Sequence, residues 1–169
     1  MADALVSPPV AGAAGVAATA LIAISSRKLK SIHRDDIVPL MGVMGAFIFA
    51  AQMINFSIPG TGSSGHIIGG ILLSAIMGPW AGFISLSSVL IIQCLIFADG
   101  GLMALGCNII NMAVTSCLIA YPLIYRPIAS TSTSRWRLSA AAVLSCVAGL
   151  ELGAVLVTFE TELSGVTAL

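Results

Sequence analysis

Long apolar runs, separated by short polar ones, extend over the whole chain. A helix rises about 1.5 Å per residue, so roughly 20 apolar residues span the hydrocarbon core of a bilayer. On this scale the pattern predicts six helical segments, at residues 7–26, 37–55, 66–77, 80–97, 103–125 and 138–159. The expected fold is therefore all-α, a polytopic transmembrane helix bundle in which residues 1–169 form a single transmembrane domain.

The third segment is shorter than a membrane span. Residues 66–77 would form roughly 18 Å of helix, and the Gly78–Pro79 turn separates them from the fourth segment. The start of this helix must lie below the membrane surface or the bilayer must thin, and irregular backbone at that depth is tolerated only where protein or a wet cavity covers it. The preceding residues 56–65 are rich in glycine and small polar residues, and His66 follows them directly. The pattern therefore predicts a polar site at His66 that opens to one side of the membrane.

Composition supports the membrane assignment. Hydrophobic residues make up 58% of the chain and charged residues 8%, whereas about a quarter of the residues of a soluble domain are charged. Such a chain lacks the charge to solvate a globular surface, which excludes a soluble protein. The cysteines all lie in apolar segments without a CxxC pair, so we expect them to be small buried residues.

The basic residues predict the orientation. They fall in two stretches, 27–36 and 126–137, and they are Arg27, Lys28, Lys30, Arg34, Arg126, Arg135 and Arg137. Basic residues concentrate in cytoplasmic loops next to membrane spans. We therefore expect a multi-pass protein of the cell membrane, with these two loops in the cytoplasm and the amino terminus outside. The same charges flank apolar spans without stacking aromatic residues, so the expected surroundings are membrane lipid and no nucleic acid.

Several polar side chains fall near the predicted outer ends of the segments. They are Gln52, Asn55, His66, Asp99, Asn108 and Asn111. Polar residues within a membrane protein usually face the bundle interior and mark a site, although any one amide could instead join two helices by a hydrogen bond. Glu151 lies inside the sixth segment and needs a partner or a proton there, and the sequence does not identify that partner.

His66 is predicted to bind a metal ion, because imidazole nitrogen suits nickel, cobalt, copper and zinc. One imidazole does not make a tight site, and the other outer candidates are the free amine of Met1 and the carboxylates of Asp3 and Asp99. Asn55 and Asn108 are expected to orient the loop or the imidazole through hydrogen bonds. The sequence has no HExxH motif and no phosphate-binding loop. No spacing supports a Ser-His-Asp or Cys-His arrangement, so we expect no catalytic residue.

Small residues recur at intervals of four in the first segment. Ala13 and Ala17 form one such pair, and Ala14 and Ala18 form another. Small residues at this spacing let helices approach closely in lipid. The partner helix could belong to the same chain or to another subunit, and the sequence leaves both open.

Five stretches of the chain read "MADALVSPPVAG", "VPLMGVMGAFIFAAQMINFSIPGTGSSGHIIGG", "GPWAGF", "FADGGLMALGCNIINM" and "ELGAVLVTFETELSG". They resemble the CbiM/NikM family, the integral membrane substrate-binding components of energy-coupling-factor cobalt and nickel transporters. The resemblance covers nearly the whole chain. It implies capture of Ni²⁺ or Co²⁺ from the outside for ATP-driven uptake, and the sequence leaves both metals open.

The resemblance also implies the partners. They are a transmembrane coupling subunit, two ATPase subunits and a small accessory membrane subunit. The chain itself would hydrolyse nothing and carry no cofactor, since the metal ion is its transported ligand.

In that family the metal is held by nitrogens of a Met-His amino terminus and of the histidine in the "SGH" motif. The resemblance therefore assigns His66 and Met1 as ligands. This chain begins Met-Ala-Asp, so the family's second-position histidine has no counterpart. Either the true start lies slightly upstream, which would restore this histidine, or the protein binds the metal differently, or it no longer binds it. With the start as written, the Met1 amine could still ligate and an Asp3 oxygen could substitute weakly. The family also continues past "ETELSG" into a further apolar helix, so we expect this chain to lack a carboxy-terminal helix relative to the family.

Two other functions fit the same membrane architecture. A substrate-binding component for a vitamin would need aromatic or hydrogen-bonding side chains around a larger pocket, and aromatic residues make up only 6% of the chain. A non-transport membrane scaffold would give His66 no role. Competition between nickel and vitamins would separate the first of these from metal capture, and His66→Ala would separate the second.

Overall fold

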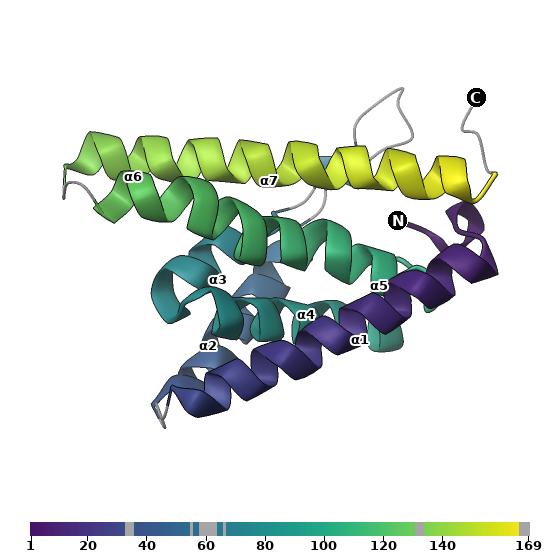
Figure 1. Cartoon of the computed structure of the whole chain (residues 1–169), viewed down its shortest axis with the longest axis horizontal. Coiled ribbons are helices and arrows are strands. Elements are labelled where there is room, and N and C mark those ends of the chain that lie inside the picture. The colour runs from purple at the N-terminus through teal and green to yellow at the C-terminus, as the bar shows by residue number, and fades with distance from the viewer. Residues whose placement is uncertain (33–35, 55, 58–63, 66, 131–133, 166–169) are drawn as a thin grey trace.

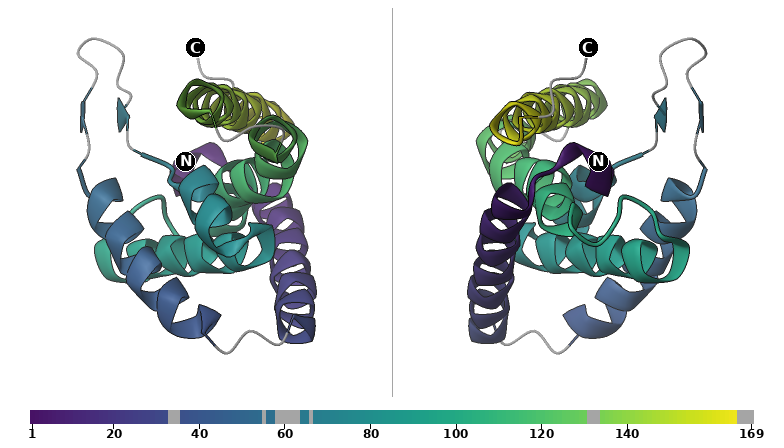
Figure 2. Two further views of the ribbon diagram at one scale, coloured as in Figure 1. Left: turned by 90° about the vertical axis from the view of Figure 1, so that its left-hand side faces the viewer. Right: turned by 90° about the vertical axis from the view of Figure 1, so that its right-hand side faces the viewer.

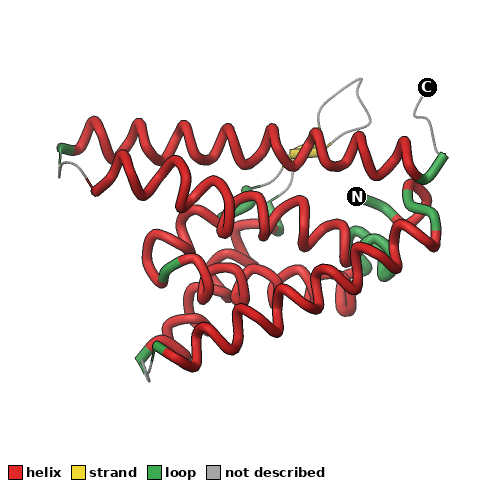
Figure 3. Tube along the Cα trace, in the orientation of Figure 1, coloured by secondary structure: helices red, strands yellow, loops and turns green. Residues whose placement is uncertain are grey.

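The computed structural model describes residues 1–32, 36–54, 56–57, 64–65, 67–130 and 134–165. Most of these residues are helical (Figures 1 and 3). In chain order the elements are η1 (Asp3–Leu5), α1 (Pro8–Ser31), α2 (Ile37–Gln52), β1 (Phe56–Ser57), β2 (Ser64–Gly65), α3 (Gly70–Met77), α4 (Pro79–Phe97), α5 (Leu105–Asn108), η2 (Ile109–Tyr125), α6 (Arg126–Ser130) and α7 (Arg135–Leu163). Because α5, η2 and α6 follow one another without a break, the described residues form six helical segments. This confirms the predicted helical bundle.

The short third helix is confirmed, but its predicted start at residue 66 is wrong, since α3 begins at Gly70. Gly69 lies directly before it with a φ of 77°, in the left-handed region that glycine adopts without strain. The residues further upstream form a two-residue antiparallel pair, β1 with β2, which the sequence did not predict. The predicted turn after α3 is present: Gly78 has a φ of 89°, and Pro79 opens α4, where its missing N–H has no cost.

Four helical segments are long and apolar enough to cross a membrane. They are Pro8–Ser31, Pro79–Phe97, Leu105–Ser130 and Arg135–Leu163. The helix α2 is also apolar but has only 16 residues, because it ends at Gln52 and not at the predicted residue 55. The chain is therefore a membrane protein, with five long or moderately long helices and the short α3 among its described residues.

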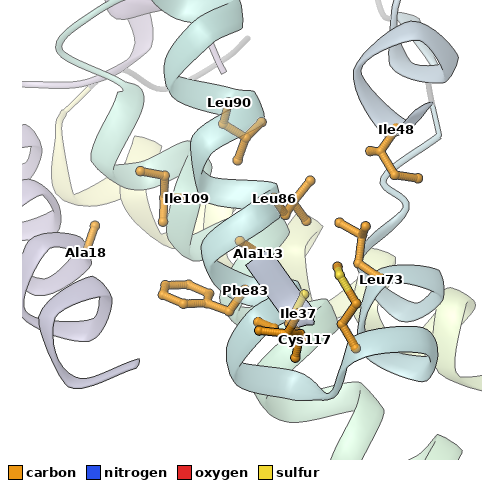
Figure 4. Packing of buried hydrophobic residues seen from close by; sticks show 12 residues of the cluster. Ala18, Ile37, Ile48, Leu73, Phe83, Leu86, Leu90, Ile109, Ala113 and Cys117 are labelled. Atoms are coloured by element: carbon orange, nitrogen blue, oxygen red, sulfur yellow. The ribbon is translucent and has the colours of Figure 1, made fainter. Parts of the chain in front are cut away.

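The helix α4 lies at the centre of the bundle and contacts α1, α2, α3 and η2. Figure 2 shows α1 and α2 on opposite sides of the molecule, with α3 and α4 between them. Phe83 and Leu86 of α4 are fully buried and pack in one cluster with Ile48, Leu73 and Cys117, which come from three other elements (Figure 4). This cluster fixes α2, α3 and η2 around α4, and so fixes the ends of these helices relative to one another.

The helix α7 packs along η2 through buried small residues at intervals of four, Ala141, Ser145, Gly149 and Gly153. A Cβ atom on Gly153 would lie 2.5 Å from the carbonyl oxygen of Asn111, so only glycine fits there. In lipid, helix association depends on such close packing, because burial of apolar surface gives little driving force. The small-residue line therefore accounts for the contact between α7 and η2.

The two ends of the bundle carry different charged residues. Lys28 lies near the end of α1, with its Nζ 5.4 Å from the ring centroid of Trp80 at the start of α4, and Arg126 follows the end of η2. At the opposite end of η2, the side-chain amide of Asn111 donates a hydrogen bond of 2.7 Å to Glu160 of α7. In Figure 1 the first end lies at the left, and the second lies at the right together with the amino terminus. The predicted basic stretches therefore share one end of the bundle.

Candidate functional site

The amino terminus folds back against the start of the η2 segment. The amine of Met1 donates a hydrogen bond of 2.7 Å to Oδ1 of Asn108. The side-chain Nδ2 of the same asparagine donates one of 3.2 Å to the carbonyl oxygen of Met1. Asn108 is buried and Met1 is partly buried. A single side chain thus holds both backbone groups of the first residue, which fixes the direction of the amine.

Asp3 anchors the next turn of the chain. Its Oδ1 accepts a hydrogen bond of 2.8 Å from the backbone N–H of Ala104, in the loop between α4 and α5. That loop passes close to the amino terminus because Gly100 and Gly101 have φ values of 83° and 84°. A Cβ atom on either glycine would collide, with Asn108 in one case and with Asp3 in the other. Glycine at both positions is therefore required for the loop to close over the amino-terminal segment.

A small cavity of about 40 Å³ lies beside the Met1 amine. Its polar wall comes from Gln93 of α4, from Asp99 in the loop after that helix and from Asn108, and its apolar wall includes Leu90. A cavity of this size with several polar partners can hold a single water molecule or ion. The arrangement offers one amine nitrogen, one carboxylate and two amides around one small space.

Burial lowers the pKa of the Met1 amine below its ordinary value, and the nearby carboxylates of Asp99 and Glu160 act in the opposite direction. Burial is the larger effect, because removal from water disfavours the charged ammonium. The amine is therefore neutral over a wider range of pH than a free amino terminus. Only a neutral amine has a lone pair that can bind a metal ion.

A chain of hydrogen bonds leads from the cavity to the segment before α3. Nε2 of Gln93 donates to Oε1 of Gln52 over 2.8 Å, and Nε2 of Gln52 donates to the carbonyl oxygen of Ile68 over 2.8 Å. The sequence placed Gln52 near the outer end of a helix and Gln93 a turn deeper, but assigned neither a role in the site. The available signal was the presence of two long amides in otherwise apolar helices.

The structure brings four of the predicted site residues to this one region: Met1, Asp3, Asp99 and Asn108. His66 and Asn55 lie outside the described residues, so the structure does not place them. Within the residues it does describe, no group of three or more His, Cys, Asp or Glu side chains could hold a metal ion. The described donors for a metal are therefore the Met1 amine and the oxygens around it.

The small residues of α1 divide between two faces of the helix. Ala14 and Ala18 are buried within the bundle, and Ala13 and Ala17 are exposed. Ala14 belongs to the α1 backbone that packs against Gly106 of α5. The exposed side of α1 carries a shallow groove lined by small residues that include Gly12 and Ala20. One alanine pair thus packs inside the chain, and the other is free to contact a second subunit.

Glu151 is exposed near the middle of α7. No hydrogen bond or ion pair to it occurs within the described part of the chain. A charged side chain at the centre of a membrane helix costs about 2.5–3.5 kcal/mol or more, which is why such residues almost always have a partner. The partner that the sequence could not identify is also not provided by the described residues.

Comparison with known proteins gives consistent matches. A family model described as the cobalt uptake substrate-specific transmembrane region matches residues 1–169. The chain is similar to a putative fused nickel transport protein of Archaeoglobus fulgidus, with 40% identity over 143 residues, which are 85% of this chain and 46% of that protein. It is also similar to a cobalt transport protein of Acetohalobium arabaticum, with 32% identity over 160 residues, which are 91% of this chain and 60% of that protein. The chain spans about half the length of such relatives.

A solved structure supports the same relationship. The chain superposes on the crystal structure of a truncated transition metal transporter with a TM-score of 0.84 and 32% sequence identity. The match covers 96% of this chain and 74% of that one. The helical arrangement described above is therefore shared with a transition metal transporter.

Proposed function

This chain belongs to the family of cobalt uptake substrate-specific transmembrane proteins, and from that premise we propose that it captures Ni²⁺ or Co²⁺ at the outer face of the cell membrane for ATP-driven uptake. Relatives named for nickel and for cobalt transport support the choice of metal. The observation that carries the proposal is the Met1 amine, which Asn108 holds beside a small polar cavity. A fixed amine nitrogen in such a place is a suitable ligand for either ion.

The amine can bind a metal without leaving Asn108. A neutral amine keeps two hydrogens, so it can still donate one to Oδ1 of Asn108 while its lone pair points to the metal. The imidazole of His66 supplies a second nitrogen in this proposal. Asp99 faces the same cavity and offers negative charge, whereas Asp3 already accepts the N–H of Ala104 and acts as an anchor of the amino-terminal segment.

The chain supplies metal capture, and its partners supply the energy. The partners proposed are a transmembrane coupling subunit, two ATPase subunits and a small accessory membrane subunit. The exposed groove of α1, with Ala13 and Ala17 nearby, offers the coupling subunit a surface on which two helices can approach closely. Because the basic loops share one end of the bundle, that end is proposed to face the cytoplasm, and the Met1 end to face outward.

The direct test is titration of the purified chain in detergent with Ni²⁺ and with Co²⁺, measured by isothermal calorimetry. We expect saturable binding of one ion per chain for at least one of the two metals, and no competition from Mg²⁺, which prefers oxygen ligands. A panel of vitamins in the same assay should not displace the metal. Absence of saturable binding for both metals would contradict the proposal.

Asn108→Ala should weaken metal binding about tenfold, the usual cost of removing a group that orients a metal ligand. The substitution removes both hydrogen bonds that hold the first residue. Asn111→Ala is the matched control, because this asparagine lies one turn further along and bonds Glu160 instead of Met1. The control should bind metal as the wild type does, and wild-type affinity in Asn108→Ala would exclude the role assigned to Asn108.

Metal affinity should rise with pH. Protons compete for the amine and for the imidazole, whose ordinary pKa is about 6.5, so lowering the pH from 7.5 to 5.5 should reduce affinity at least about tenfold. In Asp99→Asn the loss of affinity should occur at lower pH than in the wild type. The Asp99 carboxylate raises the pKa of the Met1 amine, so removal of this carboxylate lowers that pKa further. A curve that moves to higher pH in this variant would contradict the contribution of the amine.

A further inference from the structure

Two glutamines join the wall of the Met1 cavity to the segment that leads into α3. Gln93 lines the cavity and bonds Gln52, which in turn bonds the carbonyl oxygen of Ile68. Both side chains are 4% exposed. Since each amide could hydrogen-bond in only a few ways at such burial, the direction of both bonds is fixed.

The direction of each hydrogen bond between Gln93, Gln52 and Ile68 is unambiguous. The Ile68 carbonyl can only accept, so the nitrogen of Gln52 must face it, and the oxygen of Gln52 must then face Gln93. Neither amide can turn over without breaking one of these hydrogen bonds between buried groups. A buried amide left without its partner is costly, so the two glutamines move or stay as one unit.

The segment that this unit holds is also fixed from other sides. Gly69 packs so tightly against Ile48 of α2 that a Cβ atom would lie 2.6 Å from that side chain. The thiol of Cys117 on η2 lies 3.5 Å from the carbonyl oxygen of Gly70. Residues 68–70 are thus held by α2 and η2, and the bond from Gln52 connects them to the cavity through Gln93.

We propose that Gln52 and Gln93 are positioning residues for metal capture. They fix residues 68–70, which lead into α3, relative to the cavity beside the Met1 amine, and so hold the wall of that cavity in place. This inference rests on the proposed function and adds to it a hydrogen-bonded link between the metal cavity and the segment before α3. Neither glutamine need touch the metal.

The test compares Gln52→Met, Gln93→Met and the double variant in the full chain. Methionine has a similar length and no hydrogen-bonding amide. Each single variant should raise the dissociation constant for Ni²⁺ about tenfold, and the double variant should be no weaker than the weaker single variant, because the two residues act as one unit. At saturating Ni²⁺ the ligand-field absorption of the bound ion should also change, which a loss of helix packing alone would not cause.

Ser87→Ala is the matched control, because Ser87 is buried on α4 and, among the described residues, its hydroxyl bonds only the Phe83 carbonyl within that helix. It should leave both affinity and absorption unchanged. Thermal unfolding without metal identifies variants that fail to fold. If Gln52→Met fails to fold, Gln52→Glu at pH 8 replaces it, because this side chain keeps the shape of glutamine but cannot donate a hydrogen bond to Ile68.

The outcomes separate the two proposals. Wild-type affinity and absorption in the glutamine variants would overturn the positioning role and leave metal capture intact, as would strictly additive losses. Failure of the wild-type chain itself to bind Ni²⁺ or Co²⁺ would overturn both.

Discussion

His66→Ala should weaken binding of Ni²⁺ by at least about 100-fold, or roughly 2.7 kcal/mol. The expected loss exceeds that for Asn108→Ala, because the substitution removes a proposed ligand and not a group that orients one. Imidazole is also the best donor that residues 56–66 offer to nickel or cobalt. The measurement is calorimetric titration of the variant beside the wild type, with thermal unfolding of the metal-free proteins to show that both are folded.

The chain contains its own control for this experiment. It has two histidines, and the second, His33, lies in the basic stretch that is proposed to face the cytoplasm. His33→Ala should therefore bind metal as the wild type does. Equal losses in the two variants would indicate non-specific binding to imidazole, and an unchanged affinity in His66→Ala would remove this residue from the site.

Gly106→Val should destabilise the protein by about 3 kcal/mol, the upper part of the range for overpacking a close contact. A Cβ atom at this position would lie 2.5 Å from the backbone nitrogen of Gly15 and 2.8 Å from the carbonyl carbon of Ala14. Backbone atoms cannot turn aside as a side chain can, so α1 and α5 must separate. Asn108 lies two residues away, so metal binding should weaken together with stability. Thermal unfolding in detergent measures the first effect and titration the second.

Gly12→Ala serves as the comparison. Gly12 lies on the exposed face of α1, the same helix that Gly106 touches, but a Cβ atom added to Gly12 would meet no atom within 4 Å. Alanine should raise the stability of this helix by up to about 1 kcal/mol, because it favours helix more than glycine does. If Gly106→Val proves as stable as Gly12→Ala, the close contact between α1 and α5 is not present in solution.

The sequence was sufficient to predict the six segments, because apolar length alone identifies helices in a membrane protein. It did not predict that α3 begins at Gly70, since that start depends on the positive φ of Gly69 and on its packing against Ile48. These are tertiary contacts between residues far apart in the chain. The two-residue strand pair was missed for a similar reason, because so short a ladder leaves no alternating pattern.

The sequence predicted several residues of the candidate site but not the hydrogen bonds that connect the site to other parts of the bundle. The sequence indicated that Met1, Asp99 and Asn108 belong to the same outer region, and the structure brings them around one cavity. The sequence could not indicate that Gln52 bonds both Gln93 and Ile68. An amide can hydrogen-bond to many different groups, and the sequence pattern does not show which of them it meets in the fold.

The sequence could also not show which of Ala13 and Ala14 faces the interior of the bundle. In a soluble protein the inward face of a helix is the apolar one, but in lipid both faces are apolar, so the pattern carries no such signal. The structure shows that Ala14 and Ala18 face inward, where α1 packs against α4 and α5.

The number of helical segments has a consequence for anything joined to this chain. Met1 bonds Asn108 and Glu160 bonds Asn111, one turn apart at the start of η2, so the beginning of the chain and the end of α7 lie at the same end of the bundle. Six segments are an even number, and an even number of segments that alternate in direction returns a polypeptide to the end of the bundle from which it started. A domain attached directly after α7 would therefore emerge beside the proposed metal site, and only an odd number of additional helical segments would bring it to the end with the basic loops, which is proposed to face the cytoplasm.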